Sequence, residues 1–205
     1  MTQVRRRIGV MGGTFDPIHY GHLVTAEAAR KEFGLERVVF LPSGIPPHKD
    51  PKAVTGAEHR YMMTVLATLS NPHFDVSRVD IDREGVTYTV DSLKILKQLF
   101  GESTELYFIT GADAILEIVS WKNSDQLLKL AHFIGATRPG FSLQSVPKLT
   151  QEWLASHPER VHLIKVPALA ISSTDIRERV RAGDSIRYLV PEPVEHYIRR
   201  HNLYK

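Results

Sequence analysis

The chain has 205 residues, of which 42% are hydrophobic and 24% charged, and it contains no cysteine. These values are typical of a globular domain, and the lack of cysteine excludes disulfides and thiolate catalysis and makes the cytoplasm the default location. The net charge is +3, with the basic residues spread among 23 acidic ones. This distribution indicates a mixed solvated surface and an acidic small molecule as ligand, rather than nucleic acid.

The amino-terminal segment is basic and then apolar, but two glycines and an aspartate interrupt the apolar run at once, so it is not expected to be a signal peptide. No stretch approaches the roughly 18 uncharged apolar residues that a membrane span needs, so no membrane partner is expected. We expect one domain over residues 1–205, with 183–205 as a structural helical tail. The sequence sets no oligomeric state.

Five short apolar or β-branched runs have the length of strands buried on both faces, at 7–11, 37–42, 105–110, 132–137 and 161–166. Helix-period segments fall at 20–33, 57–70, 89–100, 123–131 and 173–182. This alternation predicts an α/β fold with a doubly wound, mostly parallel sheet and a small C-terminal helical portion. Ligands bind such sheets beyond the carboxyl ends of the strands, so the loops that follow strands are the candidate sites.

The helix predicted at 57–70 has a regular apolar pattern. Met62, Val65, Leu66 and Leu69 fall at positions i, i+3, i+4 and i+7. This spacing predicts that these four side chains form the buried face.

The segment GGTFDPIHYGH follows the first predicted strand and has the composition of an anion-binding loop. Gly12 and Gly13 allow backbone N–H groups to face a phosphate, and the following helix points its positive end at the same place. His19 and His22 lie one turn apart on one helix face, so both can reach the same oxyanions. Two such histidines could also be capping or surface residues, and metal ligation would need a third ligand that the sequence does not mark.

The segment ISSTDIRERV predicts a second anion site. Ser172 and Asp175 have the spacing of a capping box, and Ser173 and Thr174 add hydroxyl groups. Arg177 falls in the first turn, where the helix dipole disfavours a cation. A bound polyphosphate that accepts two parallel hydrogen bonds would explain the arginine, whereas a simple capped helix would not require it.

Three further segments have ordinary structural interpretations when their residues are taken alone. PSGIPPHKD can be a proline-rich surface loop. In GVTYTVDSL, Thr89 or Asp91 can cap a helix. In GADAILEIVSW, Asp113 can cap a helix and Trp121 can be a core residue.

GGTFDPIHYGH closely resembles the signature of the nucleotidyltransferase superfamily, whose H-x-G-H element binds nucleoside triphosphate phosphates. In its longer form it resembles the bacterial nicotinate-nucleotide adenylyltransferase family, and ISSTDIR is similar to that family's second triphosphate clamp. The resemblance implies a Rossmann-like fold and assigns catalysis to His19, His22 and Arg177. The implied ATP-binding residues are Gly12, Gly13, Thr14, Phe15, His19, His22, Ser172, Ser173, Thr174 and Arg177.

The same resemblance implies a second substrate, nicotinate mononucleotide. In the family, a Pro-Pro-His-Lys/Arg element contacts its phosphate, a Tyr-Thr pair lines the nicotinate pocket, an Asp binds a ribose hydroxyl and a Trp packs against the pyridine ring. The corresponding residues here are His48, Lys49, Tyr88, Thr89, Asp113 and Trp121, with Arg138 as a further phosphate contact. The implied reaction gives deamido-NAD and pyrophosphate without a covalent enzyme intermediate, and Mg²⁺ is held mainly by ATP phosphates and water.

Two alternatives stay open. Another small adenylyl- or cytidylyltransferase, such as the phosphopantetheine enzyme, would not need the flat-ring partners Trp121, Tyr88 and Thr89. A nucleotide-sensing binding module would not need both histidines together with Arg177. The sequence also leaves open the strength of the preference for nicotinate over nicotinamide, and whether loops 43–56 and 111–121 close on substrate.

Overall fold

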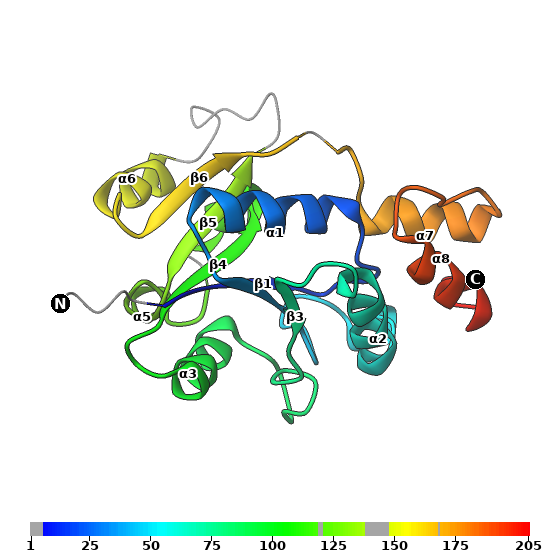
Figure 1. Cartoon of the computed structure of the whole chain (residues 1–205), viewed down its shortest axis with the longest axis horizontal. Helices are drawn as coiled ribbons and strands as arrows, with labels where there is room; N and C mark the ends of the chain where they lie inside the picture. The colour runs from blue at the N-terminus through cyan, green and yellow to red at the C-terminus, as the bar shows by residue number, and fades with distance from the viewer. Residues whose placement is uncertain (1–5, 119–120, 138–147, 168) are drawn as a thin grey trace. The chain divides into compact units, whose positions relative to one another are not determined.

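A computed structural model of the chain describes residues 6–118, 121–137, 148–167 and 169–205 (Figure 1). Six strands form one sheet in the order β3-β2-β1-β4-β5-β6. Their bounds are β1 Arg7–Gly13, β2 Arg37–Pro42, β3 Phe74–Val76, β4 Glu105–Gly111, β5 His132–Thr137 and β6 Val161–Lys165. The pairings of β1 with β4, β4 with β5 and β5 with β6 are parallel. This is the strand order of dinucleotide-binding α/β folds, in which the order reverses beside β1 and ligands bind beyond the carboxyl ends of the strands there.

The helices are α1 Tyr20–Glu32, α2 Ala57–Thr68, α3 Thr89–Phe100, α4 Ala112–Leu116, α5 Ser124–Leu130, α6 Lys148–Ser156, α7 Ser173–Ala182 and α8 Glu192–Arg200, with a 3₁₀ turn η1 at Pro51–Ala53. All five predicted strands and all five predicted helices are present. The sequence did not indicate β3, which has only three residues, or α6. The prediction that Gly12 and Gly13 belong to the loop after the first strand is wrong, since β1 continues through both.

The chain divides into two compact units, each built from separate stretches. The first unit comprises Met1–Gly12, Thr25–Val38 and Tyr88–Ala168, and the second comprises Gly13–Val24, Val39–Thr87 and Leu169–Lys205. The single domain expected over residues 1–205 stays a prediction.

In the first unit, β4 and β5 bury both faces, which explains why their sequences are almost continuously apolar. Helices α3 and α5 pack against each other, on the opposite side of these strands from α1 (Figure 1). Helix α3 begins at Thr89 with Tyr88 in the N-cap position and no side-chain cap. The prediction of a cap at Thr89 or Asp91 is therefore wrong.

In the second unit, α2 packs against α8 (Figure 1), and the buried face of α2 differs from the predicted one. Met62 and Leu69 are 41% and 78% exposed. The buried residues are instead Arg60, Met63, Thr64, Ala67 and Thr68. Two threonines tolerate burial because each hydroxyl donates to a carbonyl one turn back, Thr64 to Arg60 and Thr68 to Thr64. An apolar pattern alone could not predict a face whose polar groups are satisfied internally.

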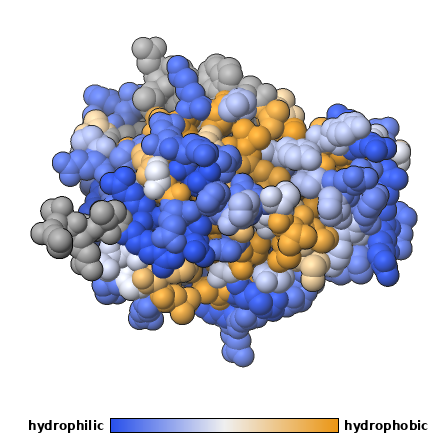
Figure 2. Space-filling model, in the orientation of Figure 1, coloured by the Kyte–Doolittle hydropathy of each residue, from blue (hydrophilic) through white to orange (hydrophobic). Residues whose placement is uncertain are grey.

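Among the described residues, no helix has the length and apolar character needed to cross a membrane. Figure 2 shows that the surface over α7 and α8 is mostly hydrophilic. In α8, the residues that face inward are Val194, Glu195 and Ile198.

Gly12 gives a test of how tightly the first unit packs around the end of β1. A Cβ at Gly12 would collide with the Phe108 ring, which Trp121 and Phe133 hold in place. We expect Gly12→Ala to lower the free energy of unfolding by about 1–3 kcal/mol, as other overpacked sites do. Gly111→Ala is the matched control, because no atom lies within 4 Å of its added Cβ. Urea denaturation measures both, and equal stability of the two variants would contradict this packing.

Candidate active site

The loop after β1 is built around the ring of Phe15. Phe15 is only 2% exposed and has a φ of 52°, a left-handed conformation that is uncommon and strained for an aromatic residue. Its ring meets the His22 ring edge-on, with centroids 5.1 Å apart. A Cβ at Gly13 would approach the same ring to 2.8 Å, so Gly13 is required for this packing. The buried Phe15 ring thus determines the conformation of this loop. The peptide bond between Asp16 and Pro17, which follows Phe15, is cis.

The two predicted histidines lie together at the start of α1. Their ring centroids are 3.8 Å apart, and the His19 N–H donates to His22 Nδ1 at 3.2 Å. Because Nδ1 accepts, the neutral His22 ring carries its proton on Nε2, which is then a donor. His22 therefore both caps the helix start and provides a donor. His19 is buried, and a Cβ at Gly21 would approach its ring to 2.9 Å, so the glycine makes room for it.

The helix start in ISSTDIRERV is capped as predicted. Ser172 Oγ accepts from the Asp175 N–H at 3.1 Å. In a full capping box the Asp175 carboxylate would also accept from the Ser172 N–H. Here it accepts from Arg179 Nε at 2.9 Å, so only the serine half of the predicted capping box is formed. The Ser173 hydroxyl donates to the Pro17 carbonyl at 2.8 Å, which ties α7 to the loop after β1.

Arg177 joins the two predicted phosphate motifs. Its Nη1 donates to the Asp16 carbonyl oxygen at 2.7 Å, across 161 residues of sequence. Its Nη2 donates to Thr174 Oγ1 at 3.3 Å. These bonds use two of the five N–H donors of a guanidinium, so the side chain is oriented while retaining donors for an anion.

Arg60 is a buried residue that braces the loops of this unit, and the sequence did not indicate it. Its side chain is 1% exposed and donates to three backbone carbonyls, those of Thr14 at 2.7 Å, Gly44 at 2.8 Å and Thr55 at 2.8 Å. Burial lowers the pKa of Arg60, and the Asp16 carboxylate opposes that shift. One buried cation thus fixes the loop after β1 and both ends of the loop at 43–56. Its only sequence signal is an arginine in a helix beside apolar residues.

The proline-rich loop after β2 adds a further positive charge to the second unit. His48 and Lys49 are exposed on it. Desolvation lowers the pKa of Lys49; Asp16 opposes this shift, while Arg177 and Arg60 strengthen it. Arg177 and Arg60 therefore both repel Lys49, and the Asp16 carboxylate attracts both Lys49 and Arg60. Several cations near one another are an electrostatic setting that suits a polyphosphate.

In the first unit, the predicted ring-binding residues are linked by a lysine that the sequence did not single out. Lys122 Nζ lies 4.2 Å from the centroid of the Tyr88 ring and 3.8 Å from Asp91 Oδ2. Tyr88 and Thr89 form the start of α3. Trp121, next to Lys122, is half-buried and packs edge-on against Phe108 with centroids 6.0 Å apart. Trp121 is therefore partly buried against the core, as one alternative expected, and keeps some exposed surface.

Two other predicted residues have different outcomes. Asp113 lies within α4, whose N-cap is Gly111, and its side chain lies outside the described part of the structure, so its predicted role stays a prediction. Arg138 lies outside the described residues. Within the described ranges, no group of three or more His, Cys, Asp or Glu side chains is arranged to hold a metal ion.

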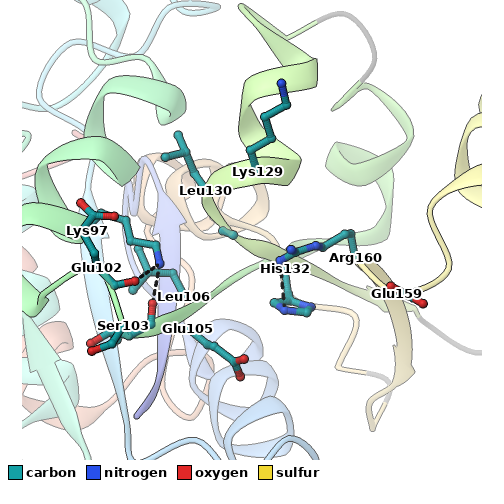
Figure 3. A pocket seen from close by; sticks show the side chains of 12 residues that line it. Lys97, Glu102, Ser103, Glu105, Leu106, Lys129, Leu130, His132, Glu159 and Arg160 are labelled. Carbon is teal, nitrogen blue, oxygen red and sulfur yellow. Dashed lines mark hydrogen bonds between the residues drawn. The ribbon is translucent and has the colours of Figure 1, made fainter. Parts of the chain in front are cut away.

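A separate hollow of about 680 Å³ lies in the first unit (Figure 3). Its lining includes Glu105 and His132, which begin β4 and β5, so it lies at the amino ends of these strands, opposite to the edge where such sheets bind ligands. Lys97 Nζ donates to the carbonyls of Glu102 and Thr104, and Arg160 Nη1 lies 3.3 Å from His132 Nε2. These interactions hold the strand ends together, and we assign the hollow no ligand.

Comparisons with known proteins show the family and the fold of this chain. The family model described as cytidylyltransferase-like matches residues 10–179. A "Probable nicotinate-nucleotide adenylyltransferase" of Moorella thermoacetica (strain ATCC 39073 / JCM 9320) is 60% identical over 97% of this chain and 92% of its own length. A protein of the same name from Thermoanaerobacter sp. (strain X514) is 56% identical over 97% and 94%. The solved Plasmodium falciparum nicotinic acid mononucleotide adenylyltransferase complexed with NaAD shares the fold, with a TM-score of 0.78, 22% identity and 98% coverage of both chains.

The buried Arg60 leads to a prediction about stability. Arg60→Met would leave three part-buried carbonyls without their donor, and an unsatisfied buried group costs about 1–3 kcal/mol. We expect the free energy of unfolding to fall by about 3 kcal/mol. Arg78→Met is the matched control, because Arg78 forms exposed ion pairs with Glu58 and Asp82 that are worth about 0–1 kcal/mol. Similar losses in both variants, measured by chemical denaturation, would contradict the bracing role of Arg60.

Proposed function

Because the chain belongs to the cytidylyltransferase-like family and, within it, to the nicotinate-nucleotide adenylyltransferases, we propose that it transfers the adenylyl group of ATP to nicotinate mononucleotide. A phosphate oxygen of the mononucleotide attacks the α-phosphorus of ATP, and the bond from that phosphorus to the bridging oxygen of pyrophosphate breaks. The products are deamido-NAD, a precursor of NAD, and pyrophosphate. The observation that carries this proposal is the bond from Arg177 to the Asp16 carbonyl, which joins the two phosphate motifs into one cationic site.

The reaction needs no protein nucleophile, since the substrate phosphate is itself the nucleophile. The chain has to align the two phosphates and stabilise the negative charge that develops on the α-phosphate and the leaving pyrophosphate. We assign this role to His19, His22 and Arg177, supported by the backbone of Gly12, Gly13, Thr14 and Phe15 and by Ser172, Ser173 and Thr174. His22 suits the role because its Nδ1 is held by the backbone and its Nε2 is a donor.

We propose that Mg²⁺ enters with ATP and is held mainly by phosphate oxygens and water. The donor set of the second unit fits this arrangement, because the Asp16 carboxylate already accepts from Thr55 N and the Tyr204 hydroxyl. When bound, the ion neutralises charge on the phosphates. The histidines and Arg177 hold the phosphate oxygens themselves.

For the mononucleotide, we propose that His48, Lys49 and Arg138 contact the phosphate and that Asp113 binds a ribose hydroxyl. Tyr88, Thr89 and Trp121 would hold the nicotinate ring. The start of α3 supports a preference for the acid, because the first N–H groups of a helix favour a carboxylate and no side chain caps this one. The Lys122 ammonium over Tyr88 lies 3.8 Å from Asp91 Oδ2 and offsets the negative charge of that carboxylate in the first turn of α3.

We further propose that the reaction takes place in the cytoplasm, without a nucleic acid or membrane partner. The chain has no cysteine, as is common for proteins of reducing compartments, and its basic residues are interspersed with acidic ones. Two solved Plasmodium falciparum relatives are complexed with NaAD and with APC, which supports nucleotides as the substrates.

The assay that tests the proposed function compares both mononucleotides. With ATP and nicotinate mononucleotide we expect pyrophosphate release, and with the amide we expect kcat/KM to be about ten- to a hundredfold lower, because an amide adds two donors that a carboxylate pocket leaves unpaired. No pyrophosphate with either mononucleotide would contradict adenylyl transfer. Equal kcat/KM would contradict the nicotinate pocket and leave adenylyl transfer standing.

His22→Ala tests the catalytic assignment. Loss of one donor to the transition state should lower kcat by about 10² to 10³, with a smaller effect on ATP affinity. His196→Ala is the matched control, since His196 is an exposed residue of the same unit on α8. A folded His22→Ala variant with near-normal kcat would show that the histidine only caps α1.

A further inference from the structure

Tyr204 reaches the loop after β1 from the segment that follows α8. Its hydroxyl donates to Asp16 Oδ1 at 2.8 Å, across 188 residues of sequence, and lies 4.0 Å from the sulfur of Met63. Burial and the Asp16 charge raise the pKa of Tyr204 well above its ordinary value. The hydroxyl is therefore a donor throughout the neutral pH range. The 183–205 tail, expected to be only structural, thus contacts Asp16 within the first of the two predicted phosphate motifs.

Asp16 binds its neighbours through both its side-chain carboxylate and its backbone carbonyl. Its carboxylate is buried, with the residue 3% exposed, and accepts from the Tyr204 hydroxyl and from Thr55 N at 3.3 Å. Its backbone carbonyl accepts from Arg177 Nη1 at 2.7 Å. The carboxylate bonds hold the Asp16 residue, and the position of its carbonyl in turn sets the position of the guanidinium.

We propose that Tyr204 is a positioning residue for ATP, which fixes Asp16 through its hydroxyl and, through the Asp16 carbonyl, orients Arg177 toward the triphosphate. The inference rests on the proposed function only in taking ATP as the ligand of Arg177. All four groups in this chain of contacts, Tyr204, Asp16, Thr55 and Arg177, belong to the second unit. A ring that merely filled space would pack equally well without its hydroxyl, so the hydroxyl is the atom to test.

Tyr204→Phe removes that hydroxyl and keeps the ring. We expect the affinity for a non-reacting α,β-methylene ATP analogue with Mg²⁺ to fall by about three- to tenfold, the scale of one hydrogen bond. In the transfer assay, KM for ATP should rise and kcat fall, while KM for the mononucleotide stays unchanged. Tyr197→Phe is the matched control, because the Tyr197 hydroxyl bonds His59 Nδ1 at 2.9 Å instead, and it should bind the analogue as the wild type does.

A double-mutant cycle separates positioning from general loosening. If Tyr204 acts through Arg177, adding Tyr204→Phe to Arg177→Ala should change the analogue affinity by less than about twofold, because the coupled group is already gone. Additive losses, or an unchanged affinity in Tyr204→Phe alone, would overturn the proposal. The cycle measures binding, so it stands even if the transfer assay shows that the second substrate is wrong.

A measurement on the wild-type chain covers the case in which Tyr204→Phe does not fold. Coupling between two sites is reciprocal, so ATP must also tighten the Tyr204 contact. The Leu203 N–H, bonded to the Ile198 carbonyl at 3.1 Å, reports on this segment. We expect the ATP analogue to slow hydrogen exchange at Leu203, and an unchanged exchange rate there at saturating analogue would overturn the proposal.

Discussion

The bond from the Arg177 guanidinium to the backbone carbonyl of Asp16 is the contact on which the site depends. It brings together a loop near the start of the sequence and a helix start near its end, and it presents one cation beside two histidines. The α7 motif provides a cation with remaining N–H donors, and the loop after β1 leads to the two histidines. The bond uses a backbone acceptor, so it orients the arginine without a carboxylate that would neutralise it and compete with the phosphates.

Arg60, like Arg177, donates to backbone carbonyls. Arg60 is buried on three carbonyl oxygens, and the carboxylate that acts on it, Asp16, also acts on Lys49. Burying a cation in this way is costly unless the cation is fully hydrogen-bonded, and Arg60 satisfies that condition. The result is one buried cation beneath the loops that it braces. We expect a bound polyanion to offset the repulsion that Lys49 experiences from Arg177 and Arg60.

The fold was largely predictable because parallel strands buried on both faces leave unbroken apolar runs, as in β4 and β5. The buried face of α2 was not predictable. Arg60 donates to backbone carbonyls that are distant in the sequence, and two threonines donate to carbonyls one turn back in the helix. The sequence predicted Gly12 and Gly13 in a loop, but both belong to β1, where their missing side chains make room for the rings of Phe108 and Phe15. Tyr204 and Lys122 carry no local pattern, and only tertiary contacts reveal their roles.

We propose that the loop after β1 and the start of α7 bind one triphosphate together. A crystal structure with Mg²⁺ and α,β-methylene ATP would test this binding mode. We expect phosphate oxygens of the same molecule to lie within hydrogen-bond distance of His22 Nε2 and of the Arg177 guanidinium, with Arg177 still bonded to the Asp16 carbonyl. A triphosphate that contacts only one of the two motifs, or that binds in the hollow of Figure 3, would contradict it.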